Sequence, residues 1–207
     1  MRQTVRLLAA LSVGALSAAF TPLSAQLITA VGYTATPGQG QAQGGSYNYF
    51  DDGGTQLTDG VLGVNNWAAN LGNGNAQEWV GWLNVSPSLL FTLPSYFQVT
   101  QVRIGFNNSQ SFGGIYLPVD VTINGAAFAL AGNEVPSGER GWVSFSTNVF
   151  ANQVQIDLED RNNGRWIFVD EVEIYGTSTV PEPSSFALLL AGASVTALLA
   201  RRRRASH

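Results

Sequence analysis

Apolar and polar residues alternate along the second half of the chain. The apolar positions are Val102, Ile104 and Phe106; Val119, Val121 and Ile123; Val154, Ile156 and Leu158; and Phe168, Val172 and Ile174. Successive side chains of a strand point to opposite faces, so this period of two predicts half-buried antiparallel strands. Between residues 26 and 179, no segment keeps a 3.6-residue apolar period for ten residues. We therefore expect few helices.

Glycine and asparagine mark the turns between these strands. Asn124-Gly125 predicts a tight hairpin, and Asn162-Asn163-Gly164 predicts a turn before the last strand. Nearer the N-terminus, residues 27–31 predict a first strand and residues 34–46 a loop. Several short strands without helices predict an all-β fold, an antiparallel β-sandwich or jelly roll.

The N-terminal residues have the pattern of a secretory signal peptide. Arg2 and Arg6 precede an apolar stretch over residues 7–20, and Ala25 places a small residue at the expected cleavage site. We expect cleavage after Ala25, which removes residues 1–25. A buried N-terminal helix is the alternative. The mature domain is then a single unit over residues 26–179, long enough for a substantial core.

The C-terminal residues 180–207 form a tail of three parts. Pro181-Glu182-Pro183 is followed by an uncharged apolar segment, residues 186–200, and then by four arginines, residues 201–204. The two prolines prevent a regular helix or central strand and leave the motif extended and accessible. An apolar run ending in arginines predicts a transmembrane helix with its basic end in the cytoplasm. A plain membrane anchor is the alternative.

This tail resembles the PEP-CTERM sorting tail of Gram-negative bacteria. The resemblance implies that an exosortase-type protease recognises Pro181, Glu182 and Pro183. It also implies export by way of an inner-membrane intermediate to the cell surface or the extracellular matrix. Proteins with this tail usually accompany exopolysaccharide or biofilm-matrix production.

Charge and composition exclude several classes of function. The mature domain holds four arginines, no lysine and 13 acidic residues, a net charge near −9. Such a domain repels phosphate backbones, so we expect no nucleic-acid partner. The chain has no cysteine, and its one histidine, His207, lies beyond the sorting motif. A histidine-based catalytic triad, a histidine-ligated zinc site and thiol chemistry are therefore excluded in the mature protein.

The mature domain resembles the galactose-binding-like, discoidin-type jelly roll. The residues that carry the resemblance are Leu57-Thr58-Asp59-Gly60, residues 79–82, residues 117–125 and the closing strand over residues 166–176. The family commonly holds a structural Ca²⁺ between the early aspartate and the closing-strand glutamate. The resemblance thus implies Asp59 and Glu171 as calcium ligands, with the backbone carbonyls of Gln56 and Asp170.

The chemistry of calcium agrees with that ligand set. Ca²⁺ binds six to eight carboxylate and carbonyl oxygens and tolerates irregular geometry. The alternative interpretation is structural: Asp59 caps its own turn, and Glu171 faces solvent.

Aromatic residues suggest a sugar-binding face, because rings pack against the apolar faces of sugars. Trp67 and Trp142 lie in glycine-bounded stretches that we interpret as loops, and Arg140 is close to Trp142. These three residues are the candidate ligand contacts. The other tryptophans, Trp79, Trp82 and Trp166, flank predicted strands and are expected in the core or at its rim. Ordinary burial is the alternative for each tryptophan.

Paired carboxylates offer a third possibility, hydrolysis of polysaccharide. The pairs are Asp51/Asp52, Glu134/Glu139 and Asp157/Glu159/Asp160. Acidic pairs in the loops of an acidic domain are usually solvated, so we predict no enzyme. The sequence favours an exported, non-catalytic module that binds carbohydrate or exopolysaccharide. The competing hypothesis is a structural matrix protein that associates with itself, and a polysaccharide-active enzyme ranks third.

Overall fold

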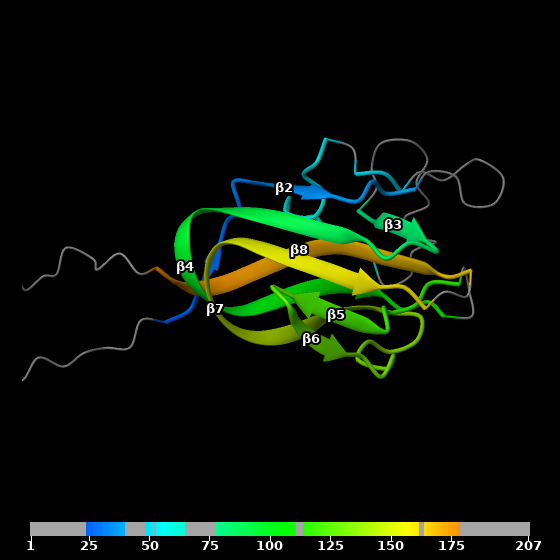
Figure 1. Ribbon diagram of the computed structural model, residues 1–207. Coiled ribbons are helices and arrows are strands. Elements are labelled where there is room, and N and C mark those ends of the chain that lie inside the picture. Colours follow the sequence, from blue (N-terminus) through cyan, green and yellow to red (C-terminus); the bar gives the residue numbers. More distant parts are fainter. Residues whose placement is uncertain are drawn as a thin grey trace, which may run out of the picture.

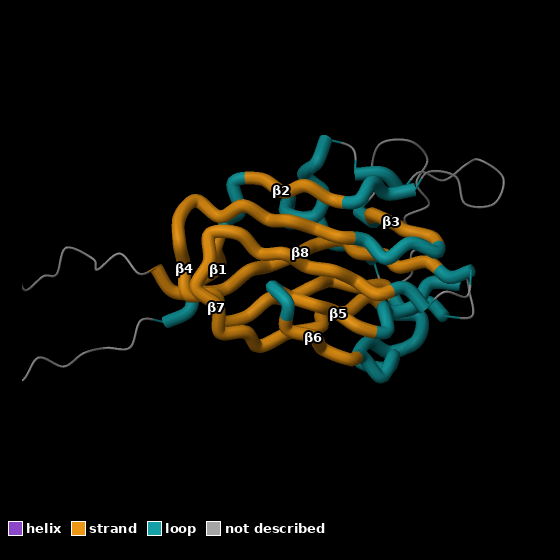
Figure 2. The backbone as a smooth tube through the Cα atoms, viewed as in Figure 1, coloured by secondary structure: helices purple, strands orange, loops and turns teal. Residues whose placement is uncertain are grey.

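The computed structural model describes residues 24–39, 49–51, 53–64, 78–110, 114–161 and 164–178. Over these ranges the secondary structure consists of strands, with no helix (Figure 2). The strands are β1 (Gln26–Ile28), β2 (Gly32–Ala35), β3 (Val80–Leu83), β4 (Ser88–Asn107), β5 (Asp120–Ile123), β6 (Ala126–Ala129), β7 (Arg140–Glu159) and β8 (Trp166–Ser178). Residues 1–23, Trp67 and the sorting motif Pro181-Glu182-Pro183 lie outside the described residues.

These eight strands pair with one another in antiparallel fashion. They follow the order β1-β8-β4-β7-β5-β6, with β2 added to β4 and β3 added to β8. The two longest strands, β4 and β7, pair with each other along most of their length, with a register shift between Thr92 and Phe97. Before the shift β4 also pairs with β2, and after it with β8. The two strands therefore bend from one layer into the other, and Figure 1 shows this bend in β4.

The core lies between the two layers and draws on the positions that the alternation predicted. Val102, Ile104 and Phe106 of β4 are buried, as are Val154, Ile156 and Leu158 of β7. A second, aromatic cluster contains Tyr49, Trp79, Ile115, Trp166 and Phe168. The predicted antiparallel β-sandwich with a jelly-roll arrangement is confirmed, and so is the burial of Trp79, Trp82 and Trp166.

The predicted turns and the first strands can also be compared with the structure. Asn124 and Gly125 join β5 to β6 with φ angles of 46° and 85°, the positive values that a type I′ hairpin requires. The expected loop over residues 34–46 begins too early, because β2 extends to Ala35. Gly32–Ala35 is only four residues long, with Tyr33 and Ala35 partly buried against the core, and its pairing with residues 89–92 of β4 makes it a strand.

Candidate functional site: an acidic pocket at the edge of β8

A loop takes the place of a strand along part of one edge of β8. On this edge β1 pairs with residues 174–176 and β3 with residues 166–169. Residues 57–63 cover the gap between them, and three hydrogen bonds hold this loop. The N–H of Val172 donates to the carbonyl of Leu57 at 2.8 Å. The N–H groups of Gly60 and Gly63 donate to Glu171 Oε2 at 2.9 Å and to Asp170 Oδ2 at 2.7 Å.

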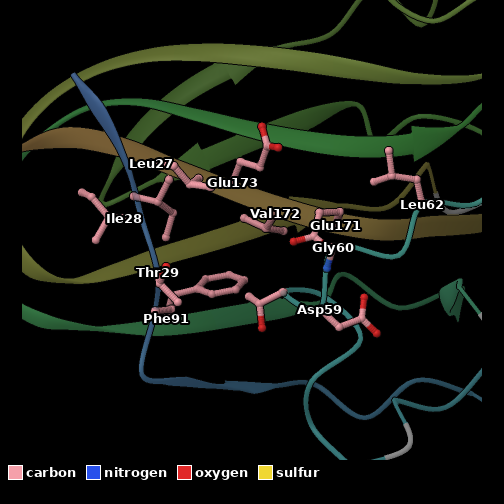
Figure 3. Close-up of a pocket in the computed structure, with 13 residues that line it drawn as sticks. Leu27, Ile28, Thr29, Asp59, Gly60, Leu62, Phe91, Glu171, Val172 and Glu173 are labelled. Atoms are coloured by element: carbon pink, nitrogen blue, oxygen red, sulfur yellow. The ribbon is translucent and has the colours of Figure 1, made fainter. Parts of the chain in front are cut away.

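A pocket of about 300 Å³ lies between this loop, β1 and β8 (Figure 3). This volume is near the lower end of small-molecule sites, roughly 300–1,000 Å³. Its apolar lining includes Leu27, Ile28, Leu62, Phe91, Val172 and Ile174. Its lining also includes three acidic residues, Asp59, Glu171 and Glu173. The pocket can therefore offer apolar contact and several hydrogen-bond acceptors to one ligand.

Glu171 is the most perturbed acidic group of this pocket. Only 6% of the residue is exposed, and burial is the main cause that raises its pKa, from 4.5 to about 7. The negative charges of Asp59, Asp170 and Glu173 raise it further, while the hydrogen bond from Gly60 lowers it. Near neutral pH, a proton or a cation at Glu171 therefore relieves repulsion between these carboxylates.

The structure brings Asp59 and Glu171 together in this pocket. Asp59 Oδ1 accepts the N–H of Val61 at 2.8 Å, so the aspartate does cap its own turn, as the alternative interpretation expected. Glu171 is buried and does not face solvent, contrary to the other half of that interpretation. The backbone of Gln56 lies at the start of the same loop, where its N–H donates to Asp51 Oδ1 at 3.3 Å.

These residues fit calcium only with help from other oxygens. Within the described ranges, no three Asp, Glu or His side chains converge as a metal site. Two carboxylates, Asp59 and Glu171, and two carbonyls, of Gln56 and Asp170, supply fewer oxygens than the six to eight that Ca²⁺ takes, unless the carboxylates bind through both oxygens or water completes the shell. The donor types are those that Ca²⁺ prefers.

Arg140 and Asp170 form a buried ion pair beside the pocket. The guanidinium Nε lies 2.8 Å from Asp170 Oδ2, and Nη2 donates to Oδ1 at 3.1 Å. The side chains of Arg140 and Asp170 are 9% and 0% exposed. Burial raises the pKa of Asp170, and Arg140 opposes that rise. A Cβ on Gly105 would lie 2.0 Å from Asp170 Oδ1, so the pair depends on a glycine at that position.

Trp142 lies in strand β7, not in the loop that the sequence predicted, and it is half-buried. Its pairing with Gly105 continues the sheet, and this overrides the loop signal of the flanking glycine. The guanidinium carbons of Arg140 and Arg103 lie 4.2 and 4.5 Å from its ring centroid. Gly105 also pairs with Glu171, so the register places Trp142, Gly105 and Glu171 in one row across three strands.

The candidate metal and ligand residues that the structure describes therefore form one connected region. Trp142 contacts Arg140, Arg140 binds Asp170, and Asp170 and Glu171 hold the loop that carries Asp59. The sequence interpretation missed a polar cluster next to it, in which Arg103 Nη1 and the hydroxyl of Tyr175 both donate to Glu173 Oε2 at 2.8 Å. The alternation of polar positions with Val172 and Ile174 along β8 was the available signal.

Three of the carboxylates considered for hydrolysis, Asp51, Glu134 and Asp157, have local structural partners, and Asp52 lies outside the described residues. Glu134 accepts the N–H groups of Ala131 and Gly132; burial raises the pKa of Glu134, but these and other backbone hydrogen bonds together lower it below its usual value. Asp157 accepts hydrogen bonds from the side chains of Ser88 and Gln155. The Asp51 carboxylate accepts the hydroxyl of Tyr33 and the N–H of Thr55.

Comparison with known protein families matches residues 179–204 to the PEP-CTERM protein-sorting motif. The chain therefore carries this motif, which indicates export by way of a membrane-anchored sorting intermediate. No curated protein matches the chain. Within the described residues, no helix has the length and apolar character of a membrane span.

Solved structures with similar architecture include carbohydrate-binding proteins. Truncated AlyQ with CBM32 and alginate lyase domains matches 78% of this chain and 36% of its own, at 17% identity and a TM-score of 0.45. A fucolectin from striped bass (Morone saxatilis) serum matches 73% and 47%, at 19% identity and a TM-score of 0.44. The family 32 CBM of NanJ from C. perfringens, in complex with galactose, matches 73% and 99%, at 15% identity and a TM-score of 0.40.

This chain spans less than half the length of the first two of these structures. With identities under 20% and TM-scores under 0.5, neither a ligand nor a role for this chain follows from these likenesses.

Proposed function

We propose that this exported domain is a non-catalytic module that holds a sugar residue of an extracellular polysaccharide in the pocket beside β8. One observation carries the proposal. The pocket combines apolar walls with the acidic residues Asp59, Glu171 and Glu173, and the row across Gly105 joins it to Trp142. Sugars need this combination, because they present apolar C–H faces and hydroxyl donors together.

The charges favour a neutral sugar. An ionised carboxylate has about four acceptor positions, and Glu171 Oε2 accepts the N–H of Gly60. Oxygens of Asp59 and Glu171 can therefore accept sugar hydroxyl groups. The domain has a net charge near −9, and the pocket adds local negative charge, so a uronate or phosphate would be repelled.

Calcium has a supporting place in this proposal. Asp59 and Glu171 would hold the ion, together with the carbonyls of Gln56 and Asp170. The bound ion would offset part of the negative charge of the pocket and fix the loop against β8, leaving the other oxygens of these carboxylates to accept sugar hydroxyls. In this role calcium stabilises the pocket, and the protein's own side chains contact the sugar.

The sorting motif gives the module its place in the cell. We propose that an exosortase-type protease processes the tail and that the domain reaches the surface or matrix of a Gram-negative bacterium. There the module would attach to exopolysaccharide. A structural matrix protein that associates only with itself is the competing proposal.

The proposal can be tested by electrophoresis of the purified protein through gels that contain bacterial exopolysaccharide. We expect retardation that is lost in Leu62→Ala, which removes part of the pocket wall. Val61→Ala is the matched control, because Val61 is exposed and outside the pocket lining. Trp142→Ala and Trp67→Ala test whether the polysaccharide extends to the tryptophans.

Three results would argue against the proposal. Equal retardation of Leu62→Ala and wild type would place the site elsewhere. Concentration-dependent self-association of a protein that is not retarded would favour the structural role. Release of shortened oligosaccharides would favour an enzyme.

A further inference from the structure

The sorting tail leaves the sandwich at the end where β4 and β7 bend. Ser178, the last residue of β8, pairs with Phe97 of β4, and Phe97 pairs with Ala151 of β7. The matched sorting motif begins at the next residue, 179. Both described ends of the sandwich, the start of β1 and the end of β8, lie here, because Gln26 pairs with Gly176 (Figure 1).

Two aromatic side chains are exposed at this end. Tyr96 and Phe150 are 52% and 54% exposed, and their rings stack with centroids 5.2 Å apart. Each is a chain neighbour of a member of the Phe97–Ala151 pair, beside the exit of the tail. Tyr96 and Phe150 do not contribute to the buried core; the core residues of β4 nearby are Phe97 and Val99.

The described strands at this end carry no charged side chain. Residues 24–36, 88–102, 141–156 and 174–178 contain no Asp, Glu, Lys or Arg. Along β8 the nearest charged residue to Ser178 is Glu173, and along β4 the nearest to Phe97 is Arg103. At about 3.3 Å per residue these are some 16 and 20 Å away. The acidic residues of the described strands thus lie towards the other end and the middle of the sandwich.

We propose that this uncharged end, with Tyr96 and Phe150 at its tip, rests on the phospholipid surface while the tail anchors the sorting intermediate. Aromatic side chains are favoured at the membrane–water interface. An uncharged surface avoids the repulsion that anionic lipids exert on acidic residues.

The length of chain between the domain and the apolar segment supports this partner. Phe186, the first residue of that segment, follows Ser178 by eight residues. Fully extended, eight residues span at most about 28 Å. The tail therefore holds the bent end of the sandwich close to the bilayer, and the exposed rings need no other protein to meet an apolar environment. The opposite end of the sandwich then points away from the membrane.

The test uses the full chain, with its tail, in vesicles of phosphatidylethanolamine and phosphatidylglycerol that include brominated lipid. The chain has no cysteine, so single cysteines can carry a fluorescent label. Ser95→Cys reports on the bent end, and Ser137→Cys reports on a loop that bonds to the far end of β4 through Gly138 and Asn108. Both positions are exposed.

We expect the label at Ser95 to be quenched and its emission to shift to shorter wavelength, while the label at Ser137 stays unquenched. Tyr96→Ser with Phe150→Ser should abolish this quenching, and Phe150→Ser alone should reduce it. Val61→Ser, which removes a similarly exposed side chain elsewhere, should leave it unchanged. A thermal melt of each variant checks that the domain remains folded.

Four outcomes overturn the proposal. One is a Ser95 label that is quenched no more than the Ser137 label. Another is quenching of the Ser95 label that persists in the variant without the Tyr96 and Phe150 rings. A shift of the Ser95 emission to shorter wavelength that appears only when the processing protease is added would show that this end binds the protease. An emission shift that depends on protein concentration and not on lipid would show that this end binds a second copy of the chain.

Discussion

Asp170 accepts two hydrogen bonds from the guanidinium group of Arg140, from Nε at 2.8 Å and from Nη2 at 3.1 Å. The pair joins β7 to β8 across the intervening strand β4. Asp170 Oδ2 also accepts the N–H of Gly63, so the same carboxylate holds the loop that covers the pocket. This ion pair therefore connects the Trp142 side of the sheet to the wall of the proposed sugar site.

Removing one partner of this pair should strongly destabilise the domain. Arg140→Ala leaves the Asp170 charge buried without its cation, and we expect a loss of about 3–5 kcal/mol in the free energy of unfolding. Denaturant titration measures this free energy of unfolding. The control is Arg103→Ala, because Arg103 and Glu173 have side chains 30% and 22% exposed, and such a pair should cost about 1 kcal/mol or less. Equal losses in the two variants would contradict this assignment.

Gly105→Ala should disturb the same pair by overpacking. The added methyl group would lie 2.0 Å from Asp170 Oδ1 and 2.5 Å from Arg140 Nη2. We expect a destabilisation of about 1–3 kcal/mol, measured by denaturant titration. Gly32→Ala is the matched control, since Gly32 is also in a strand and a methyl group there would have no atom within 4 Å. A Gly105→Ala variant as stable as Gly32→Ala would refute the tight contact.

The raised pKa of Glu171 predicts a pH-dependent stability. In the folded domain this pKa is about 7, against 4.5 for an unperturbed glutamate. Between these values the folded state binds the proton more tightly than the unfolded state, so stability should rise as the pH falls from about 7 to about 4.5. We expect Glu171→Gln to lose this part of the pH dependence.

Chemical denaturation at pH 7.5 and 5.5, in the presence of EDTA, provides the measurement. The difference between wild type and Glu171→Gln isolates the contribution of this group from the other carboxylates. The same pH dependence in both proteins would show that Glu171 titrates as an ordinary glutamate.

Calcium binding should appear as a stability change that depends on Asp59. We expect EDTA to lower the melting temperature of the wild type and Asp59→Ala to abolish that sensitivity. Asp59→Asn keeps an oxygen that can accept the N–H of Val61 but removes the negative charge. This variant therefore distinguishes loss of the metal ligand from loss of the hydrogen bond that caps the turn. Asp157→Asn, at an exposed carboxylate outside the pocket, should remain sensitive. A wild-type melt indifferent to EDTA would exclude the calcium site.

The sequence predicted the sandwich because apolar residues recur at every second position in parts of the long strands. Val102, Ile104 and Phe106 are buried in the core, while Arg103 between them is partly exposed. The alternation of residues does not predict which part of the β8 edge each neighbouring strand pairs with. The gap filled by residues 57–63, and with it the pocket, arises from the pairing of β1 and β3.

Long-range contacts also explain the errors and omissions at the site. Trp142 stands next to a glycine and therefore had the local signal of a loop, yet its pairing with Gly105 makes it part of β7. The ion pair between Arg140 and Asp170 joins residues 30 positions apart, so no local pattern could reveal it. Asp59 and Glu171 were identified through a family resemblance, and the structure places both in one pocket.

The most direct test of the proposed function is a glycan array, including bacterial exopolysaccharides, probed with the purified domain of residues 26–179 in calcium-containing buffer. We predict specific binding to a neutral glycan, and the loss of that binding in Leu62→Ala but not in Val61→Ala. A domain that melts cooperatively and binds no glycan would contradict the central claim and favour a purely structural role.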